Sequence, residues 1–244
     1  PLLAVSLNRP WPLVGAGDLP TALVTGASRG LGLAFVRAYA QHGFRVHACC
    51  RRPDQAHILR QLPGEIHLHR LDLRQPADYQ RLADRLADEP IDHLIAAAAI
   101  RGPVDHPAAL DVPGWFETFH VNAIAPLQLA ASLRRQVARS CERKMIALSC
   151  ALGSITDNCS GGLWAYRCSK AALAMAWRTL ARELAADGII CVLLDPGWVR
   201  TDLGGPAAPL TPEISVAGML ATIARLRPQD SGSFLSWQGE PRPW

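Results

Sequence analysis

Tyr166 and Lys170 form the arrangement with the clearest chemical use, because four positions separate them within a helix-forming stretch. Residues at i and i+4 lie on one face of a helix, so the phenol and the ammonium act together. At about 4 Å and an effective dielectric near 20, the ammonium favours a phenolate by about 4 kcal/mol. This predicts a pKa for Tyr166 below its usual value of about 10 and a role as general acid in carbonyl reduction. Lysine is also rare in this chain, since Lys144 and Lys170 are the only two among 25 basic residues.

A glycine-rich turn, Thr25-Gly26-Ala27-Ser28-Arg29-Gly30-Leu31-Gly32, follows an apolar run and precedes another helix-forming stretch. A strand that leads into such a turn and then a helix presents free backbone N–H groups to an anion. Glycines also let the backbone approach a pyrophosphate closely. The turn therefore predicts a dinucleotide site. Its predicted contacts are Gly26, Ser28, Arg29, Gly30, Leu31 and Gly32.

The end of the next apolar run indicates which dinucleotide binds. An NAD site usually places Asp or Glu there, about 20 residues beyond the glycines, to hold the ribose hydroxyls. This chain has Cys49-Cys50-Arg51-Arg52 instead, with no acid before Asp54. A carboxylate repels a 2′-phosphate, whereas a guanidinium binds it through paired hydrogen bonds. Arg51, with Arg29 from the glycine turn, therefore predicts NADP(H).

Short apolar runs alternate with helix-forming stretches from Thr21 onward. The predicted strands are Thr21–Thr25, Arg45–Cys49, Glu65–Leu71, His93–Ala97, Lys144–Ser149, Ile189–Leu194 and Ser233–Trp237. The predicted helices are Gly30–His42, Ala77–Ala87, Val112–Ser140, Leu163–Ala186 and Glu213–Leu226. Apolar strands between helices are typical of an α/β fold, here a single doubly wound Rossmann-like domain with a central parallel sheet of about seven strands and helices on both faces. We expect this domain over residues 20–244, after an irregular N-terminal arm over residues 1–19.

Composition excludes several other classes of protein. The chain of 244 residues is 49% hydrophobic and 19% charged, which suffices for a large buried core. Its net charge of +4 comes from scattered basic residues, so nucleic acid is not an expected partner. No apolar run approaches about 18 residues, so no membrane span is expected, and the N-terminal residues lack the pattern of a secretory signal. Seven cysteines without a C-x-x-C pair predict neither a disulfide framework nor a metal site and favour the cytoplasm.

His67 and His69 share one face of a predicted strand, which we interpret as a partly solvated face.

With both motifs identified, the chain resembles the short-chain dehydrogenases/reductases from roughly Pro20 to Trp244. The resemblance rests on the T-G-x-x-x-G-x-G turn and on the Tyr166-x-x-x-Lys170 pair. Within that superfamily the chain is similar to the C-factor and sniffer-type carbonyl reductases. The segments that carry this likeness are Gly153-Ser154-Ile155, Trp164-Ala165-Tyr166-Arg167, Asp202-Leu203-Gly204-Gly205-Pro206 and Phe234-Leu235-Ser236-Trp237-Gln238-Gly239.

The resemblance implies roles for further residues. Asn122 would support Lys170 through a water and shape a kink in its helix, while Lys170 would also hold the cofactor ribose. Asp72 would reach the adenine amino group and the Leu73 N–H would contact the ring, although Asp72 also suits a helix N-cap or a turn. In the P-G-x-V-x-T stretch, the residues expected near the nicotinamide and its phosphate are Pro196, Gly197, Val199 and Thr201.

One departure from the family pattern concerns the serine that hydrogen-bonds the substrate oxygen. Counting back three residues from Gly153 leads to Cys150. Ser149 is adjacent but points to the opposite face of a strand, and Ser154 is another candidate. A thiol is a weak donor, and loss of one oxyanion donor costs about 10²–10³ in rate in other enzymes. Cys150 would therefore contact the substrate oxygen weakly, act as a nucleophile, or only fill a pocket wall.

The second departure is the run Ala96–Ala99, where the family has Asn-Asn-Ala-Gly. Ala97 and Ala98 are expected beside the cofactor, without the polar side chains that brace the fourth strand. On the substrate side we expect Ser154, Trp164 and Trp198. The short segment Leu203–Leu210, rich in Pro and Gly, suggests an open site for a bulky or carrier-linked molecule.

These observations together predict an enzyme, an NADP(H)-dependent oxidoreductase that reduces a carbonyl of a small or carrier-linked metabolite or oxidises the alcohol. Tyr166, Lys170, Asn122 and Cys150 are the predicted catalytic residues. Two alternatives stay open: a non-redox enzyme on the same fold, and a dinucleotide-binding protein without turnover. The apolar helix Leu163–Ala186 needs more cover than one sheet gives, which predicts a homodimer.

Overall fold

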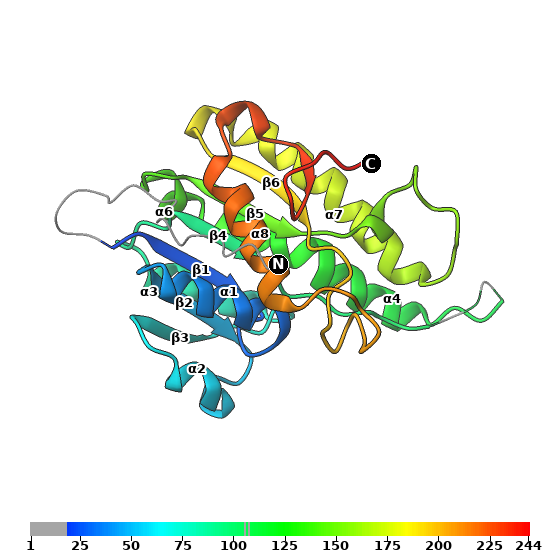
Figure 1. The fold of residues 1–244 in the computed structure, drawn as a ribbon, viewed down its shortest axis with the longest axis horizontal. Coiled ribbons are helices and arrows are strands. Elements are labelled where there is room, and N and C mark those ends of the chain that lie inside the picture. Colours follow the sequence, from blue (N-terminus) through cyan, green and yellow to red (C-terminus); the bar gives the residue numbers. More distant parts are fainter. Residues whose placement is uncertain (1–18, 105, 107) are drawn as a thin grey trace, which may run out of the picture.

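A computed structural model describes residues 19–104, 106 and 108–244, so the predicted N-terminal arm lies outside the described residues apart from Leu19. Its centre is a seven-stranded parallel sheet in the order β3-β2-β1-β4-β5-β6-β7 (Figure 1). The strands are β1 (Thr21–Thr25), β2 (Arg45–Cys50), β3 (Ile66–Arg70), β4 (His93–Ala96), β5 (Lys144–Leu148), β6 (Ile190–Asp195) and β7 (Phe234–Ser236). Parallel neighbours cannot be joined by tight hairpins, so helices connect them. The predicted fold class is confirmed.

Helices cover both faces of the sheet, and the central strands are therefore buried along their whole length. β1, β4, β5 and β6 carry no exposed residue, as expected for strands enclosed by two layers of helices. One layer contains α1 (Gly30–Gln41), α2 (His57–Gln61) and α8 (Pro212–Arg225). The other contains α3 (Pro76–Arg85), α5 (Ala125–Ser132), α6 (Arg134–Ala138) and α7 (Trp164–Glu183), with α4 (Val112–Phe119) packed on α7.

The long helix predicted over Val112–Ser140 is wrong as a single element. The chain instead forms α4, a π-helical turn over His120–Ile124, and then α5 and α6. Pro126 lies in the first turn of α5 and has no N–H to continue the ladder of the preceding helix. A π-turn is a frequent mark of functional sites in helices, and this one carries Asn122.

The interpretation of His67 and His69 as a partly solvated pair is also wrong for His69. His69 is buried, and its Nε2 lies 2.9 Å from Nδ1 of His47 on the neighbouring strand β2. Within the described residues no group of three His, Cys, Asp or Glu side chains is arranged to hold a metal. The described part of the chain also contains no helix with the length and apolarity to cross a bilayer.

The position of the site follows from the strand order. From β1 the chain winds outward through β2 to β3, and then returns to β4 on the other side of β1. At such a switch point the loops after two neighbouring strands diverge and leave a crevice at their carboxyl ends. Thr25 ends β1, and its Oγ1 accepts hydrogen bonds from the N–H groups of Ala97 (3.1 Å) and Ala98 (3.2 Å), just after β4.

Candidate active site

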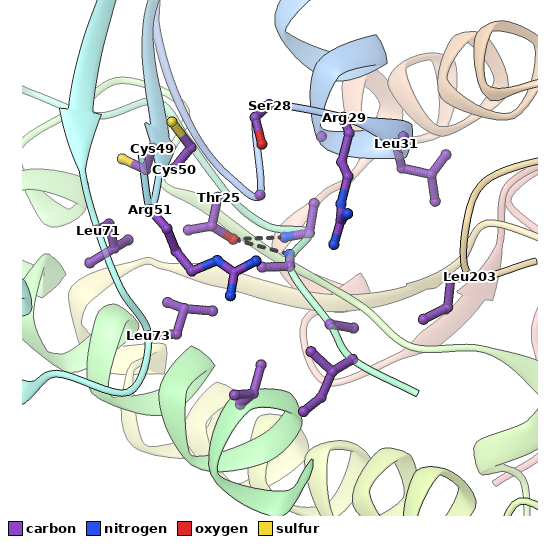
Figure 2. Close-up of a pocket in the computed structure, with 18 of the residues that line it drawn as sticks. Thr25, Ser28, Arg29, Leu31, Cys49, Cys50, Arg51, Leu71, Leu73 and Leu203 are labelled. Carbon is purple, nitrogen blue, oxygen red and sulfur yellow. Dashed lines mark hydrogen bonds between the residues drawn. The ribbon is translucent and has the colours of Figure 1, made fainter. Parts of the chain in front are cut away.

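The glycine-rich turn lines a cavity of about 410 Å³ at this switch point (Figure 2). Gly26 and Gly30 have φ of +66° and +53°, which L side chains rarely adopt. A Cβ on Gly32 would lie 2.2 Å from the carbonyl oxygen of Gly26, so the turn needs glycine there. The helix α1 begins at Gly30, with no acidic residue in its first turn. Ser28, Arg29 and Leu31 complete this wall of the cavity, which suits an anion.

Arginines surround the end of the cavity formed by β2 and β3. Arg51 borders both this cavity and an adjoining hollow, and Figure 2 shows its guanidinium reaching in from the end of β2. Arg29 reaches in from the glycine turn and forms an ion pair with Asp202 at 3.3 Å. Two guanidinium groups near one opening fit a 2′-phosphate, and no acidic residue follows β2 in the place where an NAD site has one.

Asp72 and Leu73 also line the cavity, but Asp72 is already engaged. Arg74 donates to Asp72 from its Nε at 2.9 Å, from Nη2 at 2.8 Å and from its main-chain N–H at 3.1 Å. These bonds hold the pKa of Asp72 below its usual value. Sequence reasoning missed Arg74, although its place two residues beyond Asp72 was visible. The carboxylate of Asp72 is therefore oriented by Arg74.

Ala97 and Ala98 lie in the cavity wall, where the family's asparagine side chains are absent. The two hydrogen bonds from their N–H groups to Thr25 brace the end of β4 instead. Ala98 also lies close to the glycine turn, because a Cβ on Gly26 would come 3.1 Å from its Cα. The alanine run is thus compatible with an ordered crevice.

Tyr166 and Lys170 lie on the buried face of α7, with exposed fractions of 6% and 2%. Lys170 Nζ donates to the carbonyl oxygen of Leu148 at 2.7 Å and lies 5.8 Å from the centre of the Tyr166 ring. The thiol of Cys150 donates to the phenol oxygen of Tyr166 at 3.9 Å. The structure thus brings three of the four predicted catalytic side chains, Cys150, Tyr166 and Lys170, together at the end of β5.

The predicted lowering of the Tyr166 pKa is wrong for this arrangement. Burial raises the pKa of Tyr166 well above its usual value, and Cys150 and Asp195 act in the same direction while Arg101 opposes them. The sequence argument placed the ammonium beside the phenol and left out the cost of removing a phenolate from water. Burial also lowers the pKa of Lys170 to about 8. Tyr166 is therefore held as a neutral phenol, able to donate its proton.

Cys150, rather than either nearby serine, faces the phenol. Ser154 Oγ donates to the main-chain oxygen of Trp244 at 3.1 Å and accepts from the Asp157 N–H, so it is engaged elsewhere. Ser149 is buried at the end of β5, and no hydrogen bond of its hydroxyl is found. Burial raises the pKa of Cys150, so it remains a thiol and a donor, which argues against a thiolate nucleophile.

Asn122 links three elements through its side-chain amide. Its Oδ1 accepts from the Ile100 N–H at 2.9 Å, and its Nδ2 donates to the Ile100 carbonyl at 2.8 Å and to Ser169 Oγ at 3.0 Å. The π-turn that carries Asn122 is thereby fixed to the loop after β4 and to α7. Ser169, next to Lys170, is a positioning residue that sequence reasoning missed.

The loop after β6 reaches the cavity through Thr201, whereas the predicted contacts Pro196, Gly197 and Val199 do not line it. Pro196 accepts from Ser215 Oγ of α8 at 2.7 Å, and Gly197 has φ of +76° and donates to Asp195 Oδ1 at 2.9 Å. Val199 pairs with Leu210, and Thr201 Oγ1 accepts from the Gly204 N–H at 3.1 Å while lining the cavity.

Both predicted substrate-side tryptophans are partly exposed, Trp164 at 42% and Trp198 at 56%, so neither is a core residue. Trp198 Nε1 donates to the Gly204 carbonyl at 2.8 Å, which fixes its ring against the segment after β6. Arg101, which the sequence analysis did not select, lines the cavity and donates to the Leu203 carbonyl across its mouth. It could have been noticed as the only charged residue within four positions after the alanine run.

A doubly wound parallel sheet, a glycine turn at its switch point and a buried Tyr-Lys pair together define a dinucleotide-binding enzyme fold of the Rossmann type. The sequence model described as short chain dehydrogenase matches residues 20–209, so the chain belongs to the short-chain dehydrogenase family. The residues that line the cavity, the cluster of Cys150, Tyr166 and Lys170 and the loop after β6 all lie within or beside that range.

Three proteins show where in the family this chain lies. It is 38% identical over 162 residues to the C-signal of Myxococcus xanthus, which covers 66% of this chain and 98% of that protein. The carbonyl reductase Sniffer of D. melanogaster is 31% identical with a TM-score of 0.87, and the match covers 93% of this chain and all of the other. A carbonyl reductase from chicken fatty liver, solved with NADPH bound, is 33% identical with a TM-score of 0.86 over the same shares. These similarities confirm the branch predicted from the sequence.

Proposed function

We propose that this protein is an NADP(H)-dependent oxidoreductase that reduces a carbonyl group. The observation that carries the proposal is the contact between the Cys150 thiol and the Tyr166 phenol beside Lys170. Asn122 connects the helix that carries Tyr166 and Lys170 to Ile100, which lines the dinucleotide-type cavity. The similarity to carbonyl reductases, one of them solved with NADPH, supports the cofactor and the reaction class. Oxidation of the reduced product is the same chemistry in reverse.

The residues of the cavity fit the cofactor. The glycine turn and the start of α1 would hold the pyrophosphate, and Arg51 and Arg29 the 2′-phosphate. Asp72, Leu73, Ala97 and Ala98 would border the adenosine, and Pro196, Gly197, Val199 and Thr201 the nicotinamide side. When bound, NADPH supplies the hydride for reduction.

Tyr166 is the proposed proton donor to the carbonyl oxygen. Its raised pKa keeps the phenol protonated near neutral pH, which suits reduction better than alcohol oxidation, where the phenol must accept a proton. The thiol of Cys150 would contact the same oxygen as a weak donor, and Asn122 would hold α7 and the loop after β4 in place. Trp164 and Trp198 would border the substrate, whereas the predicted Ser154 is buried and hydrogen-bonded to Trp244 and Asp157.

Consumption of NADPH at 340 nm against aldehydes, ketones and enones tests the proposal. The wild type is expected to oxidise NADPH with at least one of these classes, and Tyr166→Phe to lose about 10²–10⁴ in kcat, the usual contribution of general acid catalysis. NADH should serve far less well. NADPH binding without decay for any substrate would contradict the proposal.

The thiol also favours a second candidate, a non-redox reaction such as dehydration, isomerisation or cyclisation on the same fold. A weak donor in place of a hydroxyl suits chemistry in which the substrate oxygen gains less charge. Formation of a product without any change in NADPH absorbance would support this candidate.

A homodimer in the cytoplasm remains our expectation for the assembled protein. α4 and α7 pack together, and Phe116, on α4, and Met175, on α7, are exposed at 73% and 70%. A second copy would cover such apolar side chains. Light scattering should give twice the mass of one chain at micromolar concentrations, and the mass of a single chain would contradict this expectation.

A further inference from the structure

We propose that Arg242 is a positioning residue that holds the cofactor-binding loop after β6 by neutralising the buried carboxylate of Asp195. The inference rests on the proposed function, because the loop concerned is the one assigned to the nicotinamide side of NADP(H). Neither residue was selected from the sequence, and they lie 47 positions apart (242 − 195).

Asp195 is the last residue of β6 and is only 2% exposed. Its Oδ1 accepts from the Gly197 N–H at 2.9 Å, and its Oδ2 lies 3.1 Å from Arg242 Nη2. One carboxylate therefore connects the C-terminal segment to the first residues of the loop. Within the described residues, Arg242 is the only cation that forms an ion pair with Asp195.

The loop depends on this carboxylate for its direction. Gly197 has φ of +76°, and a Cβ there would come 2.8 Å from Leu210 Cδ1, so the chain turns sharply in a confined space. The bond to Asp195 fixes the N–H of Gly197 at that turn, and the turn sets the path to Val199 and Thr201. Thr201 then lines the cavity beside Gly30.

The backbone of the C-terminal segment places the guanidinium. Residues after β7 turn back and run antiparallel to it, with a bridge between Leu235 and Pro241. Arg242 N–H donates to the Phe234 carbonyl at 2.8 Å, and Ser236 N–H donates to the Glu240 carbonyl at 2.7 Å. The backbone of Arg242 is thus fixed to β7 through its own N–H and through the Glu240 carbonyl two residues earlier.

The same segment also reaches the loop after β5. The main-chain oxygen of Trp244 accepts from Ser154 Oγ at 3.1 Å and from the Thr156 N–H at 3.0 Å. The Trp244 ring lies over Arg178, 5.0 Å from its guanidinium carbon. The C-terminal segment Gly239–Trp244 therefore contacts both loops that border the candidate active site.

Ion pairs that are exposed at a protein surface contribute little to the free energy of unfolding. The difference here is that Asp195 is buried, so water does not solvate or screen its charge and the carboxylate needs a partner. Without Arg242, the carboxylate loses its neutralising cation and its fixed position under Gly197. An asparagine at position 195 would have no charge to neutralise, yet its Oδ1 would still accept from the same N–H.

A double-mutant cycle on NADPH binding tests the proposal, with calorimetry or tryptophan quenching as the readout and no turnover required. Arg242→Gln is expected to raise the Kd for NADPH about tenfold, because it removes one partner of a buried ion pair. Asp195→Asn should bind within about threefold of the wild type, and the double variant should match Asp195→Asn rather than Arg242→Gln. Arg242→Lys should recover part of the affinity.

Arg178→Gln is the matched control, because it removes another arginine that contacts the C-terminal segment but does not touch Asp195. Its Kd for NADPH should stay at the wild-type value. In turnover, Arg242→Gln should raise KM for NADPH more than it lowers kcat, a split that general destabilisation would not produce. If Arg242→Gln folds poorly, Arg242→Lys and the double variant still decide the question.

Equal NADPH affinity of the wild type and Arg242→Gln would overturn the inference while leaving the proposed function intact. Additive effects of the two substitutions would also overturn it, because they would show that Arg242 does not act through Asp195. A wild type that binds no NADPH would remove the proposed cofactor and this inference together.

Discussion

The thiol of Cys150 donates a hydrogen bond to the phenol oxygen of Tyr166 across 3.9 Å, at the position where the family has a serine hydroxyl. Sulfur is larger than oxygen and its S–H is a weak donor, so the contact is longer and less polar than a hydroxyl–phenol hydrogen bond. Because burial raises the pKa of both groups, they are neutral together at physiological pH.

Cys150→Ser should therefore raise carbonyl reduction. A hydroxyl donor in this place would stabilise the developing charge on the carbonyl oxygen, by up to the 10²–10³ in kcat that such a donor contributes elsewhere. Rates of NADPH oxidation with the best carbonyl substrate provide the measurement. Cys168→Ser, an exposed cysteine two residues after Tyr166 on α7, is the control and should leave the rate unchanged. A Cys150→Ser variant slower than the wild type, with intact NADPH binding, would favour the non-redox alternative.

The pKa of Lys170 predicts that the rate of carbonyl reduction declines above neutral pH. Burial lowers its pKa to about 8, so the side chain is charged below that pH and neutral above it. If the charge is needed to support the phenol and the ribose, kcat/KM for NADPH should fall as pH rises through about 8, by up to about tenfold per pH unit. In Lys170→Arg the side chain stays charged at every accessible pH, so the decline should disappear. The kcat/KM of this variant should be lower than that of the wild type. A flat wild-type profile from pH 7 to 9.5 would contradict the assignment.

Arg51 should distinguish the two nicotinamide cofactors. Arg51→Ala removes a guanidinium from the opening assigned to the 2′-phosphate, so the Kd for NADPH should rise at least about tenfold while that for NADH stays the same. Arg60→Ala is the control, because Arg60 is an exposed arginine of α2 that pairs with Asp54 and lines neither hollow. Equal losses for both cofactors would instead indicate a general effect of charge on the site.

Most of the fold could be predicted from the sequence because the signals are local. Strands buried on both faces appear as unbroken apolar runs, and the predicted strands agree with β1 to β7 within about two residues at each end. The glycine turn and the spacing from Tyr166 to Lys170 are local as well. The branch of the family, carried by short segments such as Gly153-Ser154-Ile155, was recognised on the same basis.

Features that depend on contacts distant in the sequence could not be predicted. The Tyr166 pKa rises through burial, which a spacing of four residues does not reveal. The ion pair between Asp195 and Arg242 joins β6 to a segment that only the folded sheet brings beside it. The π-turn at Asn122 breaks a stretch whose apolar pattern continues without interruption, so periodicity alone predicts one helix.

The buried pair of His47 and His69 predicts that the protein loses stability in mild acid. Burial lowers the pKa of His47 to about 3 and that of His69 to about 4, whereas both titrate near 6.5 in the unfolded chain. The unfolded state therefore binds more protons below pH 6.5, and the free energy of unfolding falls as pH decreases from 6.5 towards 4, by up to about 1.4 kcal/mol per pH unit for each histidine. Urea unfolding between pH 4.5 and 7.5 measures this slope. His69→Gln removes one of these groups and should reduce the slope measurably, although buried His93 also contributes to it. His57→Gln, at an exposed site, is the control. A His69→Gln variant with the full wild-type slope would show that other groups cause the acid sensitivity.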